Sequence, residues 1–253
     1  MKAAKPKEQA IVRPPAGGKW NYKQSRFSHL APIPVRCLIA DRTGSGKSSA
    51  VFSAVTDHYR GCFTAIRIIA RTAFLDHTYV QLREWAEKTL HQDQKDEPFV
   101  FTSLDDPGLM TLFDEHAEKV KREKIQRKID KSREPLSGVC WIVDDVSDSA
   151  ALRQRNESLL NKLVTVGRHS NQSIFCSVHA LSAVSPLIRK NASMLLVFKI
   201  SNHKEYDMLR EEFSWLVGKN EFDEIYQAAV GKGAPAYSFM TILPHEHLSL
   251  IHI

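Results

Sequence analysis

The chain has 253 residues, of which 43% are hydrophobic, and it carries a formal net charge of +6. This length and composition suit one globular domain with tails and argue against a second full domain. No apolar stretch reaches the roughly 18 residues that span a bilayer, and the basic start of the chain lacks the apolar segment of a signal peptide, so a transmembrane or secreted protein is not expected. The positive charge favours polyanionic partners such as nucleic acid.

The four cysteines, Cys37, Cys62, Cys140 and Cys176, are far apart in the sequence. None forms a metal-ligand pair by spacing. We expect them to be reduced packing residues, which implies a reducing, intracellular compartment.

Residues 1–34 contain seven basic residues, one acid and five prolines. This composition predicts a basic, largely extended N-terminal arm. A solubilising leader and a polyanion contact or targeting signal are equally compatible with it.

From Val35 onward, short apolar runs alternate with longer amphipathic segments, as in strands joined by crossover helices over a parallel sheet. The predicted domain spans residues 35–243, and residues 244–253 form a C-terminal tail. The core strands are expected at Val35–Ala40, Ala65–Ala70, Val139–Val143, Ser173–Val178 and Met194–Ile200, with possible extra strands at Phe99–Thr102 and Ala236–Leu243. Helices are expected near Gly46–Tyr59, Thr78–Leu90, Gly108–Lys131, Ala150–Val166, Leu181–Asn191, Lys204–Trp215 and Glu221–Val230.

The stretch from Glu115 to Glu134 holds eight Lys or Arg residues mixed with acids. Acids at helical spacing favour a solvated, self-paired helix face over a DNA contact.

A phosphate-binding loop is predicted between the first strand and the first helix. Two glycines, Gly44 and Gly46, let backbone amides approach phosphate oxygens, and the following helix start points its positive end at the same anion. Lys47 is expected to reach the β- and γ-phosphates of ATP, and the Ser48 hydroxyl to bind Mg2+. The predicted nucleotide-binding set is Asp41, Arg42, Thr43, Gly44, Ser45, Gly46, Lys47, Ser48 and Ser49.

Asp41 departs from the P-loop pattern, because the first position of GxxxxGK[ST] is normally glycine. Aspartate tolerates left-handed torsions better than most residues, so the turn can form. Its charge is unfavourable near phosphates unless the side chain turns away, which affects the expected affinity for ATP.

The apolar run from Val139 to Val143 ends in two carboxylates, Asp144 and Asp145. A buried parallel strand opens at its carboxyl end onto the ligand crevice. We expect Asp144 to hold Mg2+, directly or through water and Ser48, and Asp145 to orient or deprotonate the attacking water. A kinase transfers the phosphoryl group to an acceptor hydroxyl and needs no second acid to activate water. The second acid beside the metal ligand therefore favours hydrolysis.

A further buried strand, Ser173–Val178, is followed by His179, which either senses the γ-phosphate or faces solvent. Arg168 and Arg189 follow predicted helices at places suited to a subunit interface. An arginine supplied across such an interface stabilises charge on the transferred phosphoryl group.

Taken together, DRTGSGKSS, IIARTAFLDHTY, IVDDV and GRHSNQSIFCSVHALSAVSPLIRKNASMLLVFK resemble the poxvirus-type viral DNA-packaging ATPases in the FtsK-HerA group of P-loop NTPases. The resemblance runs from about Val35 to Phe213. It implies an α/β fold with a doubly wound, mostly parallel sheet of the RecA/FtsK-HerA type and helices on both faces. In that fold the strand before His179 lies between the phosphate-loop strand and the acidic-pair strand.

The resemblance also implies what the protein does and with which partners. It implies an ATPase that forms a homo-oligomeric ring and translocates double-stranded DNA into a preformed capsid, in contact with a capsid or vertex protein. By position, the catalytic residues would be Lys47, Asp144, Asp145, His179, Arg168 and Arg189, with Ser48 and Asp144 on the metal. His179 occupies the sensor position, where the family commonly has Gln. Arg168 is the first candidate for the trans-acting arginine, and Arg189 is the second. The expected location is the virus assembly site in the host cytoplasm or nucleus, or the virion itself.

Two alternatives stay open at the level of sequence. One is a P-loop small-molecule kinase, which the single compact domain allows. The other is a nucleotide-dependent assembly factor that does not hydrolyse ATP, which the unusual Asp41 and His179 allow.

Overall fold

The computed structural model describes residues 20–40, 46–144 and 158–244. They form one seven-stranded sheet with the order β3-β2-β4-β5-β1-β6-β7, parallel except for β7, which pairs antiparallel with β6. The strands are β1 (Arg36–Ala40), β2 (Ala65–Ala70), β3 (Val100–Phe101), β4 (Val139–Asp144), β5 (Gln172–Val178), β6 (Met194–Val197) and β7 (Met240–Ile242). The order confirms that β5 lies between β1 and β4.

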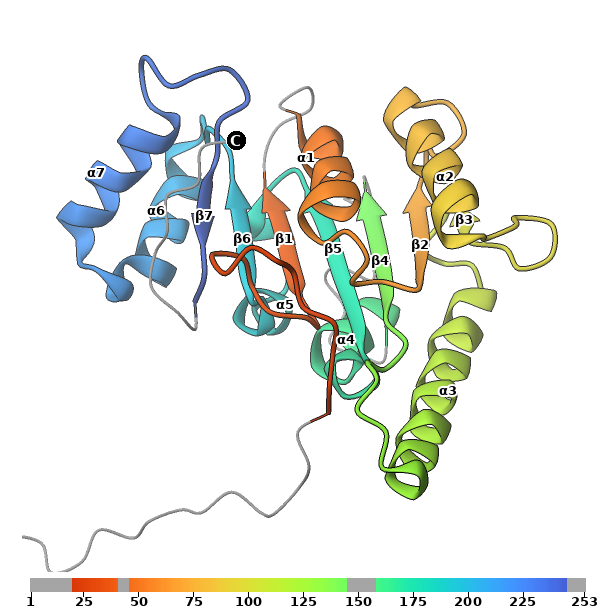
Figure 1. The fold of residues 1–253 in the computed structure, drawn as a ribbon. Helices are drawn as coiled ribbons and strands as arrows, with labels where there is room; N and C mark the ends of the chain where they lie inside the picture. The colour runs from red at the N-terminus through yellow and green to blue at the C-terminus, as the bar shows by residue number, and fades with distance from the viewer. Residues whose placement is uncertain (1–19, 41–45, 145–157, 245–253) are drawn as a thin grey trace, which may run out of the picture.

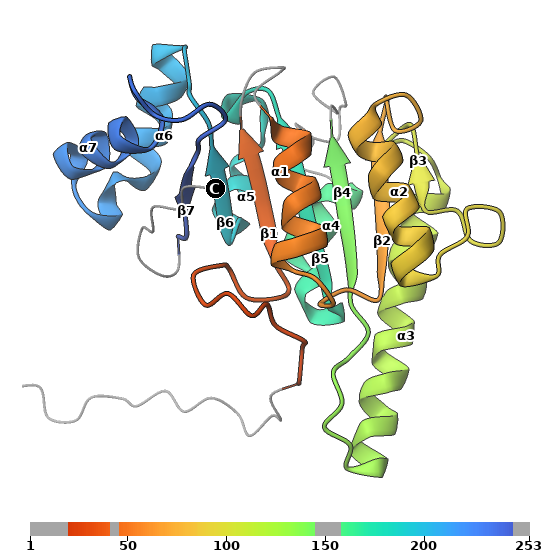
Figure 2. The same ribbon diagram turned by 45° about the horizontal axis from the view of Figure 1, so that its top comes forward.

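Helices cover both faces of the sheet (Figure 1). The α-helices are α1 (Lys47–Ser53), α2 (His77–Leu90), α3 (Gly108–Asp130), α4 (Leu159–Thr165), α5 (Pro186–Asn191), α6 (His203–Phe213) and α7 (Lys219–Val230). Shorter turns are the π-helix η1 (Ala54–His58) and the 3-10 helices η3 (Gly167–Ser170), η4 (Leu181–Ala183) and η5 (Ser214–Leu216). In Figures 1 and 2, α1 and α2 lie on the front face, with α4 and α5 behind.

The two faces of the sheet carry separate hydrophobic cores. Successive side chains of a strand point to opposite faces. On β1, Leu38 and Ala40 belong to the core under α4 and α5, whereas Cys37 and Ile39 belong to the core under α1 and α2. This two-sided burial explains why the strands read as continuous apolar runs.

The helix predicted over Leu181–Asn191 is interrupted in the structure. It consists of η4 and α5. Pro186 begins α5, and at this first position its missing N–H would have had no partner within the helix. The Ser185 hydroxyl caps α5 by accepting from the Ile188 amide at 3.4 Å. Of the helix predicted over Ala150–Val166, residues 150–157 lie outside the described part of the chain.

Residues 20–34, predicted to belong to an extended arm, pack against the domain. The Tyr59 hydroxyl donates to the Ala31 carbonyl at 2.8 Å, and the Ser25 hydroxyl donates to the His58 carbonyl at 2.5 Å. Ala31 and Ile33 are buried. These apolar residues therefore join the core on the α1 side. The proline-rich, basic composition of the segment did not predict this packing. Residues 1–19 lie outside the described part.

The four cysteines are buried and unbridged, as predicted. Burial, and then the charge of Asp144, raise the pKa of Cys176 to about 12. Such thiols stay protonated and act as packing residues. Among the described residues, no helix is long and apolar enough to cross a membrane.

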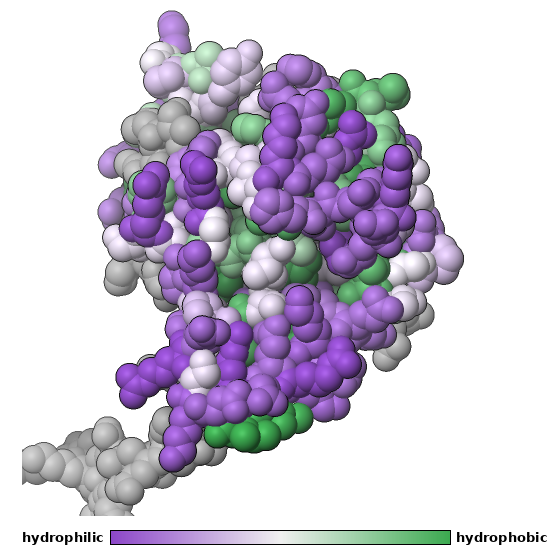
Figure 3. All heavy atoms as spheres, turned by 45° about the vertical axis from the view of Figure 1, so that its right-hand side comes forward, coloured by the Kyte–Doolittle hydropathy of each residue, from purple (hydrophilic) through white to green (hydrophobic). Residues whose placement is uncertain are grey.

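Helix α3 extends beyond the amino edge of the sheet (Figure 2). Within it, Lys121 pairs with Glu118 and Arg127 with Glu123, which agrees with the predicted self-paired face. Figure 3 shows a largely hydrophilic surface on this side with a green patch near its lower end.

His116 on α3 gives the fold a pH dependence. Burial, and then the charges of Lys119 and Arg67, lower the pKa of His116 to about 4, below the ~6.5 of an exposed histidine. Above pH 6.5 His116 is neutral in both the folded and the unfolded chain, so its titration does not change the free energy of unfolding. Between pH 6.5 and 4 the unfolded chain binds a proton that the folded chain excludes, and stability falls as the pH falls. We expect unfolding free energies from urea melts to fall by about 2 kcal/mol more for the wild type than for His116→Gln between pH 7 and pH 4.5.

The matched control is His203→Gln, because His203 is an exposed histidine. Its acid sensitivity should equal that of the wild type. Equal losses in the wild type and His116→Gln would refute this account of His116.

Candidate nucleotide-binding site

The site lies at the edge of the sheet where parallel β1, β4 and β5 have their carboxyl ends. Helix α1 starts at Lys47, and Gly46 before it has a φ of 95°. A side chain at Gly46 would be strained by this torsion, and its Cβ would lie 3.1 Å from the Tyr237 ring. The requirement for glycine inferred from the sequence therefore has a structural cause. Asp41, Arg42, Thr43, Gly44 and Ser45 lie outside the described residues.

Lys47 and Ser48 occupy the first turn of α1. Lys47 is only 8% exposed, although it is charged. Ser48 is half-buried and Ser49 is exposed. The amides of a helix's first turn have no partners within the helix, so they are available to an anion.

Asp144 is held in place by two hydroxyl groups. At 9% exposure it is nearly buried. The Tyr79 hydroxyl donates to its Oδ2, and the Ser177 hydroxyl donates to its Oδ1. The register explains the second contact, because Val143 pairs with Cys176 and Asp144 thus lies beside Ser177.

Tyr79 connects this carboxylate to the first helix. Its hydroxyl also accepts a hydrogen bond from Ser48. Burial, and then the negative charge of Asp144, raise the pKa of Tyr79. The phenol therefore remains a donor at physiological pH, and Ser48 and Asp144 converge on one oxygen atom.

The sequence did not single out Tyr79 or Ser177. Ser177 interrupts the apolar run of β5 one position before its end, which is the one signal that sequence offers. Tyr79 lies on α2 and is the last residue of the IIARTAFLDHTY segment. Its contact with Asp144 depends on how α2 packs on the sheet.

Removing either hydroxyl should leave the Asp144 carboxylate with one hydrogen bond fewer and a less fixed orientation. A hydrogen bond to a charged group contributes about 1.5–3 kcal/mol. We expect Tyr79→Phe and Ser177→Ala each to lower the free energy of unfolding by about 2 kcal/mol and to slow ATP turnover about tenfold. Urea melts and steady-state phosphate release measure the two effects. Tyr22→Phe is the control, since Tyr22 follows Asn21, whose carbonyl accepts from the Leu136 amide on the amino side of β4. Turnover of Tyr79→Phe as fast as that of the control would contradict the role.

The oxygen donors present suit Mg2+. It prefers hard oxygen ligands and binds through one or two protein groups together with phosphates and water. The Ser48 hydroxyl and the Asp144 carboxylate fit this preference and share the Tyr79 contact. The described residues contain no cluster of three or more His, Cys, Asp or Glu that would suggest a metal site made of protein ligands alone. Asp145, the predicted partner of Asp144, lies outside them.

The three remaining predicted residues have different surroundings. His179 follows Val178, which pairs with Ala40, so it lies exposed at the edge that carries Lys47 and Asp144. Arg168 lies exposed on η3, at the opposite edge of the sheet. It therefore lies away from Lys47 and Asp144 of its own chain, and its role in trans stays a prediction.

Arg189 is held by contacts within the chain. Its Nε donates to Glu212 at 2.8 Å, and its Nη1 donates to the carbonyls of Leu181, at 3.2 Å, and Val184. This arrangement ties α5 to α6 and to η4. It gives Arg189 a structural role that the sequence did not predict.

Comparison with known proteins shows the fold. No protein-family model matches the sequence, and no curated protein matches it. Among solved structures, it is similar to the genome packaging NTPase B204 from Sulfolobus turreted icosahedral virus 2 in complex with AMP, with a TM-score of 0.53, 15% identity, and coverage of 87% of this chain and 98% of that chain. The same protein in complex with AMPPCP gives a TM-score of 0.51 and 15% identity over 87% of this chain and 99% of that chain. The chain therefore has the fold of a P-loop NTPase, a mostly parallel sheet with helices on both faces.

Proposed function

We propose that the protein is an ATP-hydrolysing motor of the FtsK-HerA group, related to the poxvirus-type packaging ATPases, that drives double-stranded DNA into a preformed capsid. The observation that carries the hydrolytic part is the convergence of Ser48 and Asp144 on Tyr79, beside Lys47. A phosphate-binding helix start and a fixed carboxylate thus lie together at the carboxyl edge of the sheet, where ligands of such folds bind.

Each residue has a defined part in hydrolysis. Lys47 and the amides of the first turn of α1 bind the β- and γ-phosphates. Ser48 and Asp144 hold Mg2+, which neutralises charge on the phosphates when bound. Asp145 orients the attacking water, and His179, which follows β5 at the same edge, senses the γ-phosphate. Tyr79 and Ser177 fix the orientation of the Asp144 carboxylate, which would hold Mg2+ together with Ser48.

The DNA-packaging part is supported by the resemblance of the motifs and by the similarity to a genome packaging NTPase over 87% of the chain. The net charge of +6 agrees with a polyanionic substrate. In this proposal the subunits form a ring on a capsid or vertex protein, at the site of virus assembly.

Translocation is tested by displacement of a triplex-forming strand from long double-stranded DNA. We expect ATP with Mg2+ to displace the strand and AMPPCP not to. Hydrolysis without displacement, at every salt concentration from ~50 to 200 mM, would count against a motor and favour the small-molecule kinase, which would then be sought as a phosphorylated metabolite by mass spectrometry.

A trans role of Arg168 has its own test. Arg168→Ala should bind ATP normally but turn it over slowly, and so should Asp145→Asn. Mixed rings contain interfaces that have both intact residues, so the mixture should recover part of the wild-type rate. No recovery would remove the trans role.

A further inference from the structure

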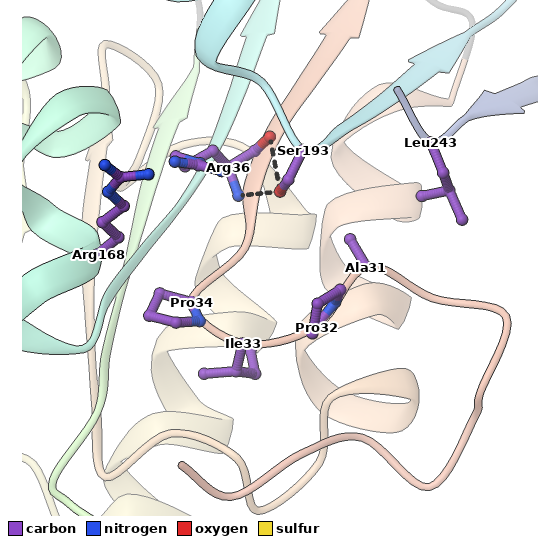
Figure 4. A pocket seen from close by; sticks show the side chains of 8 residues that line it. All are labelled: Ala31, Pro32, Ile33, Pro34, Arg36, Arg168, Ser193 and Leu243. Atoms are coloured by element: carbon purple, nitrogen blue, oxygen red, sulfur yellow. Dashed lines mark hydrogen bonds between the residues drawn. The ribbon is translucent and has the colours of Figure 1, made fainter. Parts of the chain in front are cut away.

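A second pocket lies at the amino edge of the sheet, away from Lys47 and Asp144. It has a volume of about 220 Å3. Residues 31–34 and Leu243 form apolar walls, and Arg36, Arg168 and Ser193 supply polar groups (Figure 4). Nothing in the proposed ATPase mechanism uses Arg36 or this pocket as a whole.

Two guanidinium groups face one another in this pocket. In Figure 4 the side chain of Arg36, from β1, points toward that of Arg168, from η3. Burial, and then the charge of Arg168, lower the pKa of Arg36. The Arg36 Nε is buried and has no hydrogen-bond partner, and neither arginine forms an ion pair within the described ranges 20–40, 46–144 and 158–244.

This arrangement destabilises the fold unless an anion is present. A buried donor without a partner loses the hydrogen bond that water would give it, and two like charges repel. The backbone of Arg36 is fixed, because its amide donates to the Ser193 hydroxyl at 2.9 Å and its carbonyl accepts from the Ser193 amide at 2.9 Å. The strand therefore fixes the backbone from which the Arg36 side chain enters the pocket, and its unpartnered Nε is available to a ligand there.

The pocket's chemistry defines its ligand. Two planar guanidinium groups match the paired oxygens of a carboxylate. The apolar walls call for hydrocarbon next to the anion, and the volume is below the ~300–1,000 Å3 of pockets that hold drug-sized ligands. We infer that this pocket binds an aspartate or glutamate side chain of a partner protein, with an adjacent apolar residue against residues 31–34 and Leu243.

This inference differs from the trans role of Arg168 in ATP hydrolysis. A phosphate of a neighbouring subunit's nucleotide would use the charge of Arg168 but not the apolar walls. An acidic peptide would use both, and it would depend on Arg36 as much as on Arg168.

The test uses three probes with the full-length protein. They are the capped peptides acetyl-Leu-Glu-Leu-amide and acetyl-Leu-Gln-Leu-amide, and inorganic phosphate. We expect calorimetry or NMR titration to show the glutamate peptide binding at least about tenfold more tightly than the glutamine peptide, because only the carboxylate pairs with both arginines. Arg36→Gln and Arg168→Gln should each weaken it about tenfold, whereas Arg60→Gln, at an exposed arginine elsewhere, should not.

Three results would overturn the inference. They are equal binding of the two peptides, binding that survives both arginine substitutions, and phosphate binding as tight as that of the glutamate peptide, which would indicate a simple anion site.

Arg168→Glu provides a second, independent readout. It places a carboxylate beside Arg36 within the chain itself. We expect the melting temperature to rise by about 2–4 °C and the glutamate peptide to stop binding. A lower melting temperature together with retained peptide binding would contradict the inference.

Discussion

Replacing Lys47 with alanine is expected to lower the affinity for ATP about 100-fold and to abolish measurable turnover. Lys47 is almost buried at the start of α1, so its ammonium group acts on phosphates in a partly desolvated site. Loss of such a charge contact costs about 3 kcal/mol, which corresponds to roughly 100-fold in affinity.

Binding of a fluorescent ATP analogue and phosphate release measure the two effects of Lys47→Ala. Lys88→Ala is the matched control, because Lys88 is an exposed lysine on α2 whose contact with Glu84 is a surface pair. Circular dichroism should show that both variants fold. Near-normal turnover by Lys47→Ala would refute the assignment of the phosphate loop.

Replacing Asp144 with asparagine is expected to have the second large effect. The amide keeps the size of the side chain but removes the negative charge that holds Mg2+. Removing a single group that stabilises the transition state typically costs about 100–1,000-fold in turnover, and we expect a loss in this range.

The effect of Asp144→Asn should depend on the metal. ATP affinity without Mg2+ should be at least as high as that of the wild type, since the substitution removes a carboxylate that repels the phosphates. The strengthening of binding by Mg2+ should be lost. Asp114→Asn, an exposed acid on α3, serves as control. Full turnover by Asp144→Asn would exclude Asp144 from the metal site.

The sequence predicted the sheet well because its strands are buried on both faces. The strands around Cys37, Ile68 and Ile142 are apolar at all but one position each, so their length and type follow from composition. The edge strands β3 and β7 were harder, because they have only two and three residues.

The sequence predicted the positions of those site residues whose geometry one segment of chain determines. Gly46 and Lys47 are neighbours in sequence, and Asp144 ends a strand, so both placements follow from local pattern. Tyr79, Ser177 and the Arg189–Glu212 pair each join segments more than 20 residues apart. Such contacts depend on strand register and helix packing, which hydrophobic periodicity does not specify.

The pocket at the amino edge of the sheet also depends on a contact between distant segments, which the sequence does not specify. Sequence placed Arg168 beside a possible subunit interface but gave no reason to associate it with Arg36, 132 positions away. Parallel pairing of β1 and β5 brings their amino ends together and creates the second pocket.

Steady-state phosphate release with ATP and Mg2+, with and without long double-stranded DNA, tests the proposed motor most directly, with Lys47→Ala as the blank. We predict turnover that DNA stimulates severalfold and that disappears in Lys47→Ala, because one site supplies both binding and hydrolysis. Turnover that persists in Lys47→Ala, or no phosphate release by the wild type with or without DNA, would contradict the account.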